Sequence, residues 1–372
     1  MRTVLYEKHV ESGAKMVDFA GWEMPLWYKK GQSAEHIATR KNAGLFDICH
    51  MGEFYIMGPK STDMLSLLLT SNITSMKDGQ ASYNFMLNHT GGAIDDCIVY
   101  KFNEEKWMMV VNAGNIEGDF QWIKKNNIKN VELLNKSRKI AKLDLQGPDS
   151  PKIIKDLTDE ETLKKFGFFK FKENVKIKDI PVLLSRTGYT GEIGFEIYLS
   201  SDMAGNLWDI LLDAGEKYGI EPCGLGARDS LRTEAGLPLH GHEIHPDMPA
   251  LNTPWDFVFD WEHEFIGKKA LIALKEQKTA PFVLPFKMTG RSKAMPGWDA
   301  LQDGIKIGHV VSGVISPSLN NTPIGFLVSE KDIADGTFLK FNQQGSKRIL
   351  EGKIATSPFI KPTSRMKMKH FL

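Results

Sequence analysis

Two adjacent carboxylates, Asp95 and Asp96, interrupt an otherwise apolar and β-prone run, "GGAIDDCIVY", at residues 91–100. Burying an unpaired carboxylate is costly, so both side chains need partners. The run is predicted to form the second strand of a hairpin whose turn is "NHTGG". Because side chains alternate across a strand, the two acids must point to opposite faces. We therefore expect one of them to face a cleft and the other to lie on a wetter face.

A third carboxylate, Glu196, lies in the apolar strand "GFEIY", next to the glycine-rich turn "RTGYTGEIG". Charged residues are rarely fully buried unless they are paired. Such a carboxylate can accept two parallel hydrogen bonds from an N–H and NH₂ edge, as on a guanidinium or a pterin ring. The structural alternative is a salt bridge to Arg186 or Arg228. For Asp96, a turn cap or an arginine partner competes with a carboxylate aimed at a cationic or proton-bearing group.

Two arginines, Arg228 and Arg232, stand four residues apart in "GARDSLRTEAG" and share one face of a predicted helix. A guanidinium fork matches a carboxylate, so one of them is a candidate for binding a substrate carboxylate. The other would then pair with Asp229 or Glu234. Three more polar residues lie in the same kind of turn-rich segment, and each alone is explained by a structural role: Tyr83, Asn112 and Tyr189.

Four histidines gather in and near a proline-rich segment and resemble a metal-ligand set at first sight: His240, His242, His245 and His263. The run "HGHEIH" does not match a helical HExxH pattern, because Pro238 and Pro246 bracket it. No cysteine stands close by to complete a site, so we expect no metal. The three cysteines fit neither a zinc pattern nor a CxxC pair, and are expected to be free thiols in a reducing compartment.

The composition of the chain narrows the classes of protein that remain. Its 372 residues suffice for two or three domains, and 42% hydrophobic with 25% charged residues indicates a packed globular core. A formal net charge of +1 argues against nucleic acid as the main partner. We see no apolar run of about 18 residues for a membrane span, and "MRTVLYEKHVES" lacks the apolar core of a targeting signal. The expected location is the bacterial cytoplasm or an organelle matrix.

The hydrophobic periodicity places these residues on helices, strands and turns. Helices are predicted at 33–44, with Ser33 as the N-cap and Gly44 as the stop, and at 62–72, 202–219 and 226–236. Strands are predicted at 54–58, 81–102 (as the hairpin), 106–115 and 182–200 (as two strands around a turn). Residues 237–264 are expected to be a loop or linker. From about residue 280, short β-like runs alternate with turn residues, which predicts a small β-barrel or sandwich.

Seven stretches, in this order, carry a specific likeness: "GAKMVDFAGWEMPLWY", "EHIATRKNAGLFDICHMGE", "GGAIDDCIVY", "VVNAGN", "LQGPDS", "RTGYTGEIGFEIY" and "GLGARDSLRTEAGLPLHG". Together they resemble the aminomethyltransferase (T-protein) family of the glycine cleavage system. The likeness covers nearly the whole chain and is denser before about residue 241 than after it. Relatives of this family include folate-dependent demethylase domains and a folate-binding protein of iron–sulfur maintenance.

The resemblance implies an α+β fold, a three-domain cloverleaf around a central folate-binding hole, with a small C-terminal β-barrel. The domain limits that follow are 1–50 plus 140–240 for domain 1, 51–139 for domain 2, 241–280 for a linker and irregular region, and 281–372 for the barrel domain. The activity implied is that of a tetrahydrofolate-dependent aminomethyltransferase. Such an enzyme moves a methylene group from aminomethyl-lipoyl H-protein to tetrahydrofolate, a co-substrate, and releases ammonia.

The family roles transfer to this chain by matching motifs. The resemblance implies that Asp96 is the catalytic acid near the reactive folate nitrogens, and that Glu196 holds the pterin edge. A carboxylate there can stabilise positive charge that develops on nitrogen and can help to move a proton. The remaining residues that the resemblance assigns to folate contacts are Tyr83, Asn112, Tyr189 and Arg228.

The chain departs from the family pattern mainly after residue 238. His240 stands where the family usually has tyrosine, and Trp255 and Phe257 of "TPWDFVFDW" replace a stretch of Pro, Glu, Ala and Gly. The family tends to carry an arginine near the position of Met295. In this chain, only Arg291 is close to that position. Two bulky aromatics could narrow the donor side of the hole. The alternative function is therefore a tetrahydrofolate-dependent demethylase acting on a small N-methyl or S-methyl donor; a third hypothesis is a folate-binding assembly protein without catalysis.

Overall fold

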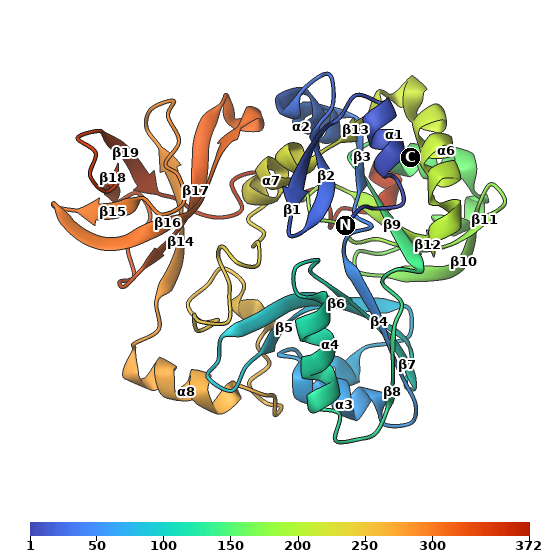
Figure 1. The fold of residues 1–372 in the computed structure, drawn as a ribbon, viewed down its shortest axis with the longest axis horizontal. Helices are drawn as coiled ribbons and strands as arrows, with labels where there is room; N and C mark the ends of the chain where they lie inside the picture. The colour runs from blue at the N-terminus through green and yellow to red at the C-terminus, as the bar shows by residue number, and fades with distance from the viewer.

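The computed structural model describes residues 1–372, apart from the side chain of Glu160. Three bodies of β structure with attached helices are arranged around the centre of the molecule (Figure 1). We call them the first lobe, the second lobe and the barrel. The predicted α+β fold with a C-terminal β-barrel is confirmed. None of the described helices is long and apolar enough to span a membrane.

The first lobe is built on a six-stranded sheet in the order β10-β11-β12-β9-β3-β13, in which only β13 and β3 are parallel. Its strands are β3 (Ala43–Asp47), β9 (Ile140–Gln146), β10 (Phe171–Ile177), β11 (Ile180–Ser185), β12 (Gly194–Ser200) and β13 (Ile220–Cys223). Its helices are α1 (Tyr6–Glu11), α2 (Gln32–Lys41), α5 (Ser150–Leu157), α6 (Ala204–Gly215) and α7 (Leu225–Glu234), and β1 (Lys15–Phe19) and β2 (Trp22–Trp27) form a separate ribbon.

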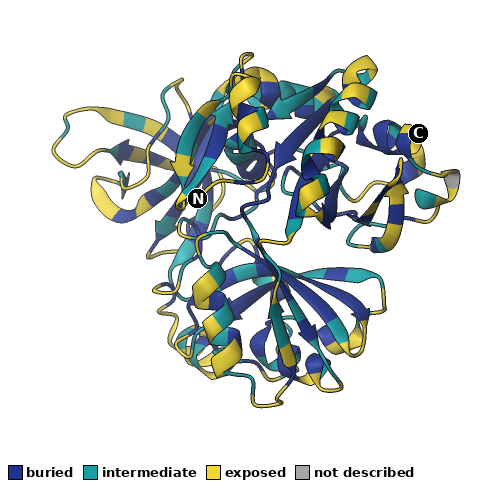
Figure 2. Cartoon of the chain, turned by 45° about the vertical axis from the view of Figure 1, so that its right-hand side comes forward, coloured by how far each residue is buried: buried dark blue, intermediate teal, exposed yellow. Residues whose placement is uncertain are grey.

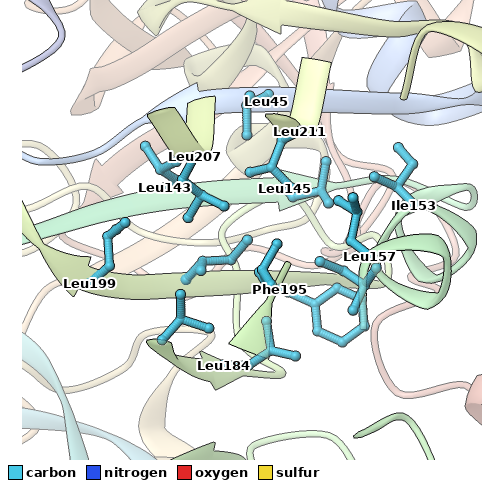
Figure 3. Packing of buried hydrophobic residues seen from close by; sticks show 14 of the residues in the cluster. Leu45, Leu143, Leu145, Ile153, Leu157, Leu184, Phe195, Leu199, Leu207 and Leu211 are labelled. Carbon is cyan, nitrogen blue, oxygen red and sulfur yellow. The ribbon is translucent and has the colours of Figure 1, made fainter. Parts of the chain in front are cut away.

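Alternation along the central strands of this sheet separates an apolar face from a polar one. Leu143 and Leu145 of β9 and Phe195 of β12 pack with Leu207 and other residues of α6 in one buried cluster (Figure 3). The residues between them on the same strands are polar, and they point to the opposite face. One side of the sheet is thus a hydrophobic core, and the other side is free to line a site.

The second lobe is a five-stranded antiparallel sheet in the order β5-β6-β7-β4-β8. Its strands are β4 (Gly52–Met57), β5 (Gln80–Leu87), β6 (Ala93–Asn103), β7 (Lys106–Val111) and β8 (Glu132–Asn135), and its helices are α3 (Ser61–Leu68) and α4 (Ile116–Lys125). The predicted hairpin is present as β5 and β6. Buried strands and exposed outer helix faces are visible in Figure 2.

The two faces of β6 correct one expectation about the adjacent acids. Cys97 and Val99, on the face of Asp95, belong to the hydrophobic core under α3 and α4. Asp95 itself is fully buried there, with 0% exposure. The prediction that the acid facing away from the cleft, Asp95, lies on a wetter face is therefore wrong, because helix packing covers that face.

The barrel is closed in the order β14-β17-β16-β15-β18-β19. Its strands are β14 (Phe282–Met288), β15 (Asp299–Gln302), β16 (Ile305–Ser316), β17 (Thr322–Ser329), β18 (Phe338–Asn342) and β19 (Ile349–Ile354). Of the two predicted architectures, barrel or sandwich, the structure has the barrel. Residues beyond it run back to the first lobe, where Met368 joins the core of that lobe.

Residues 241–280, expected as a linker and irregular region, are more ordered than that. They contain α8 (Lys268–Gln277), and Ile244, Trp255 and Phe265 share a buried cluster with Phe85 of the second lobe. The sequence analysis predicted no helix here, although α8 is as long as α2 and α7 and its Leu271 packs into the same cluster. The exact domain limits stay a prediction.

Helix ends also differ from expectation. The helix predicted at 33–44 begins at Gln32 after Gly31, without a side-chain cap from Ser33, and it ends at Lys41. Gly44 does not stop it but lies in β3, where the added Cβ of any other residue would come 2.2 Å from Thr39 Oγ1. Sheet packing, not helix termination, requires this glycine.

Candidate active site

A cavity of about 740 Å³ lies at the junction of the lobes. All six residues singled out from the sequence line it: Tyr83, Asp96, Asn112, Tyr189, Glu196 and Arg228. They come from β5, β6 and the turn after β7 in the second lobe, and from β12, the turn before it and α7 in the first lobe. The volume falls in the range of small-molecule sites.

Asp96 is held by donors on both of its oxygens. Tyr83 OH donates to Oδ2 at 2.9 Å, and Asn112 Nδ2 donates to Oδ1 at 2.8 Å. Burial, together with the nearby charge of Asp95, raises the pKa of Asp96 to about 7. Around neutral pH this carboxyl can therefore exist with or without its proton, as proton transfer requires.

Asp95, on the opposite face of the sheet, bonds to the same asparagine, Asn112. Its Oδ2 accepts from the backbone N–H of Asn112 at 2.9 Å, and its Oδ1 accepts from the side chains of Asn112 and Asn115, each at 2.8 Å. Asp119 of α4 lies next to it, and burial and the charge of Asp95 raise the pKa of Asp119 well above the usual range. The two acids of "DD" thus have one partner in common, Asn112, and different surroundings.

Glu196 is 3% exposed and lies at the other end of the candidate site. Thr187 Oγ1 donates to its Oε2 at 2.6 Å, and Lys142 Nζ lies 3.4 Å from its Oε1. Burial opposes ionisation, but Lys142 and the hydroxyl donors outweigh burial and lower the pKa of Glu196. The expected structural alternative, a salt bridge to Arg186 or Arg228, is wrong, because the paired cation is Lys142.

The two arginines of α7 have different environments. Arg228 Nη1 donates to Asp144 Oδ2 at 3.1 Å, and its guanidinium lies 4.6 Å from the ring centre of Tyr189. Arg232 is 1% exposed and bonds to Asp229, as one alternative predicted, and to Glu243 and Ser312. Arg228 therefore faces the cavity, whereas Arg232 joins α7 to the following loop and the barrel.

The four histidines are each hydrogen-bonded separately. His240 lies 2.9 Å from Asn115 Nδ2 and 3.1 Å from the carbonyl of Ala93, and so belongs to the Asp95 cluster. The His242 and His263 rings contact backbone carbonyls. Among the residues whose side chains are described, no group of three or more potential ligands could hold a metal ion.

The sequence analysis did not single out three further candidates for a functional role: Lys142, Asp144 and His50. Lys142 and Asp144 alternate in "IAKLDLQ", on the polar face of β9, so the pattern used for Asp96 and Glu196 would have found them. His50 lines the cavity, its Nδ1 has no partner among the described residues, and burial lowers its pKa to about 3. His50 lies in the family-like stretch that ends "LFDICHMGE", which was the available signal. No local pattern predicts its burial, because that arises from tertiary packing.

The two unusual aromatics occupy different places. Trp255 is 2% exposed, donates from Nε1 to the carbonyl of Gly236 at 2.8 Å and packs against Phe326. Phe257 is 71% exposed at the edge of the cavity. Trp255 is thus part of the core, and Phe257 is open to solvent. Both side chains nevertheless line the central cavity, so a narrowing of the donor side stays a prediction.

Fold and cavity together define a three-lobed α+β protein whose central cavity is lined by the carboxyl groups of Asp96 and Glu196, one from each of two lobes. The chain matches the family described as "GCVT N-terminal domain" over residues 5–263. It belongs to the family of aminomethyltransferases of the glycine cleavage system, the T-proteins. The resemblance seen in the sequence is confirmed.

Individual relatives support this assignment over nearly their whole length. An aminomethyltransferase from Caldanaerobacter subterraneus is 46% identical over 320 residues, which are 86% of this chain and 85% of that protein. One from Shouchella clausii is 41% identical over 98% of both chains. The crystal structure of glycine cleavage system aminomethyltransferase T from Bartonella henselae is 32% identical, with a TM-score of 0.89 over 98% of this chain and 99% of that one.

Proposed function

We propose that this protein transfers a methylene group from the aminomethyl-lipoyl arm of H-protein to tetrahydrofolate, with release of ammonia, in the cytoplasm. The observation that carries the proposal is the cavity, in which Asp96 and Glu196 stand on facing lobes of a T-protein fold. The high coverage of relatives named aminomethyltransferase supports the reaction class.

The residues present fit a folate. A pterin offers adjacent N–H and NH₂ donors, and the ionised, buried Glu196 is an acceptor suited to them. Arg228 offers a guanidinium at the cavity wall, and Tyr189 adds an aromatic surface beside it. Tetrahydrofolate, when bound, supplies the nitrogens that accept the one-carbon unit.

Asp96 is the residue we assign to chemistry. Held by Tyr83 and Asn112, its carboxylate can stabilise positive charge on a neighbouring nitrogen without reorganising. Because its pKa is raised to about 7, it can also accept and return a proton under physiological conditions. Asn112, Asn115 and Asp95 act on it as positioning residues.

A product assay tests this proposal. Purified protein and tetrahydrofolate are incubated with aminomethyl-lipoyl H-protein, and in parallel with small methylated amines and sulfonium compounds. We expect methylenetetrahydrofolate and ammonia only with H-protein. Methylated folate from a small donor, without turnover of H-protein, would overturn the proposal and favour the demethylase alternative.

A further inference from the structure

The two carboxylate oxygens of Glu196 are unequally occupied. Its Oε2 accepts hydrogen bonds from three hydroxyl groups, those of Thr187 at 2.6 Å, Tyr198 at 3.1 Å and Tyr100 at 3.2 Å. Among the described residues, its Oε1 contacts only the ammonium of Lys142, at 3.4 Å. A carboxylate oxygen has about two lone-pair sites, so Oε1 keeps a capacity that Oε2 lacks. We therefore expect a ligand N–H that binds Glu196 to lie at Oε1, next to Lys142.

Lys142 is a buried ammonium with few partners. Its side chain is 1% exposed, comes from the polar face of β9 and lines the central cavity. Its Nζ lies 3.4 Å from Glu196 Oε1 and 3.5 Å from Met51 Sδ, and the ring centre of Tyr198 is 5.2 Å away. A charged N–H···O bond is typically about 2.7–2.9 Å long. No described residue gives this ammonium an oxygen acceptor at that distance, so its burial leaves donors for a ligand.

A second buried lysine provides the contrast. Lys101 is also 1% exposed, but it donates to the carbonyl of Met76 at 2.8 Å and to the carboxylate of Glu104. It is not among the residues that line the central cavity. Of these two lysines, Lys101 is thus satisfied within the protein, whereas Lys142 lies at the cavity wall with donors to spare.

We propose that Lys142 donates a hydrogen bond to the 4-carbonyl oxygen of the pterin, while Glu196 Oε1 accepts from the adjacent ring N–H. The inference rests on the proposed function and names the edge of the substrate that is recognised. In a 4-oxopterin these two groups form a lactam, a donor beside an acceptor. Glu196 and Lys142 present the complement, an acceptor beside a donor.

This pairing makes Lys142 a specificity-determining residue. A 4-amino analogue carries a donor in place of the carbonyl oxygen and lacks the proton on the adjacent ring nitrogen. Its amino group would face the ammonium of Lys142, and donors on both sides would be left unpaired. The protein should therefore select 4-oxo over 4-amino pteridines.

Equilibrium binding of two ligands tests this assignment: tetrahydrofolate and 4-amino-4-deoxytetrahydrofolate. The wild-type protein should bind tetrahydrofolate at least about tenfold more tightly, the factor that one hydrogen bond to a charged group provides. In Lys142→Met this preference should fall by about tenfold. Lys142→Gln can turn either a donor or an acceptor toward the ligand, so it should lose the preference while its Kd for tetrahydrofolate stays within about threefold.

Lys101→Met is the matched control, because it removes one equally buried positive charge away from the cavity. It should keep the wild-type preference. Equal affinity of the wild-type protein for the two ligands, or an unchanged preference in both Lys142 variants, would overturn the role of Lys142 and leave the proposed function standing. Failure of the wild-type protein to bind either ligand would instead contradict the proposed function itself.

Discussion

Three carboxyl groups near the candidate site illustrate how surroundings decide protonation. Burial and a neighbouring acid raise the pKa of Asp96 to about 7 and that of Asp119 well above the usual range, whereas Lys142 outweighs burial and lowers the pKa of Glu196. The residue types are nearly identical, but the dielectric surroundings and the nearest charge differ. Acid–base roles at this site are therefore set by neighbours, and substitutions of neighbours should be measurable.

The pH dependence of turnover should report Asp96. Since its carboxylate is the active form and its pKa in the ligand-free protein is raised to about 7, kcat/KM for tetrahydrofolate should rise as the pH passes from 6 to 8. Asp96→Asn should lower kcat by about a hundredfold or more and remove this limb, while folate binding is retained. An exposed control, Asp332→Asn, should keep the wild-type profile. A flat wild-type profile would contradict the role of Asp96.

Glu196 should contribute to both stability and folate binding, and the two effects can be separated. Glu196→Gln leaves the Lys142 ammonium buried without its charge partner, so we expect a loss of about 3–5 kcal/mol in the free energy of unfolding. The double variant Lys142→Met/Glu196→Leu should recover most of this stability but not the affinity for folate. Denaturant unfolding and equilibrium binding measure these quantities; recovery of folate affinity in the double variant would refute the binding role.

At the scale of elements, the β5–β6 hairpin carries Asp96 and rests its tip on the loop before α8. Asn88 Nδ2 donates to the carbonyl of Pro246 at 2.8 Å, and Ala250 N–H donates to Gly91 O at 2.9 Å. A Cβ on Gly92 would meet Pro246 O at 1.8 Å. The close approach of two backbones fixes the tip of the hairpin, and with it the position of Asp96, which lies near this turn on β6.

Gly92→Ala should therefore destabilise the protein by about 1–3 kcal/mol, because backbone must move to admit the methyl group. Gly118→Ala is the matched control. Gly118 lies within α4, and a Cβ there meets nothing within 4 Å, so this change should stabilise by about 0.5–1 kcal/mol. Thermal unfolding of both variants measures the difference; equal shifts would disprove the close-packing argument.

Local patterns in the sequence predicted most elements of the second lobe and the β-rich barrel, but less than half of those in the first lobe. They also placed Asp96 and Glu196 on strands, next to turns. Alternation alone shows that Asp95 and Asp96 diverge, but only the packing of α4 shows that the Asp95 face is dry. The same alternation in "IAKLDLQ" would have placed Lys142 on the polar face of β9, but the sequence analysis did not apply it there. The burial of His50 depends on segments far apart in the chain, which no local pattern reveals.

At the scale of the whole molecule, α7 joins the first lobe to the barrel. Glu234 Oε2 lies 2.9 Å from Arg40 Nη2, and its Oε1 accepts from Ser316 of the barrel. Arg232 Nη2 donates to Ser312 of the barrel at 2.8 Å. These buried polar contacts fix the angle between the two bodies and, through it, the shape of the cavity between the lobes.

Lowering the pH should weaken the contacts of Glu234 between α7 and the barrel over a defined pH range. Burial opposes ionisation of Glu234, but His36, Arg40 and Ser316 outweigh it and lower its pKa from 4.5 to about 2. The stabilisation, on the order of 3 kcal/mol, is therefore present above pH 4.5 and is lost as the pH falls towards 2. The difference in unfolding free energy between wild type and Glu234→Gln should be largest at pH 6 and shrink below pH 4.5. A difference independent of pH would contradict this linkage.

The segment after the barrel has a consequence for how the chain is made. Thr363 N–H donates to Gly191 O, Arg186 donates to Ser364 O, and Met368 is buried in the core of the first lobe. Domains usually fold in order of synthesis, the earliest first. Here the lobe that contains residue 5 lacks part of its interior until residue 368 has left the ribosome. We therefore expect the first lobe to be completed after the second lobe and the barrel, so that the nascent chain exposes an unfinished core until residue 368 has emerged.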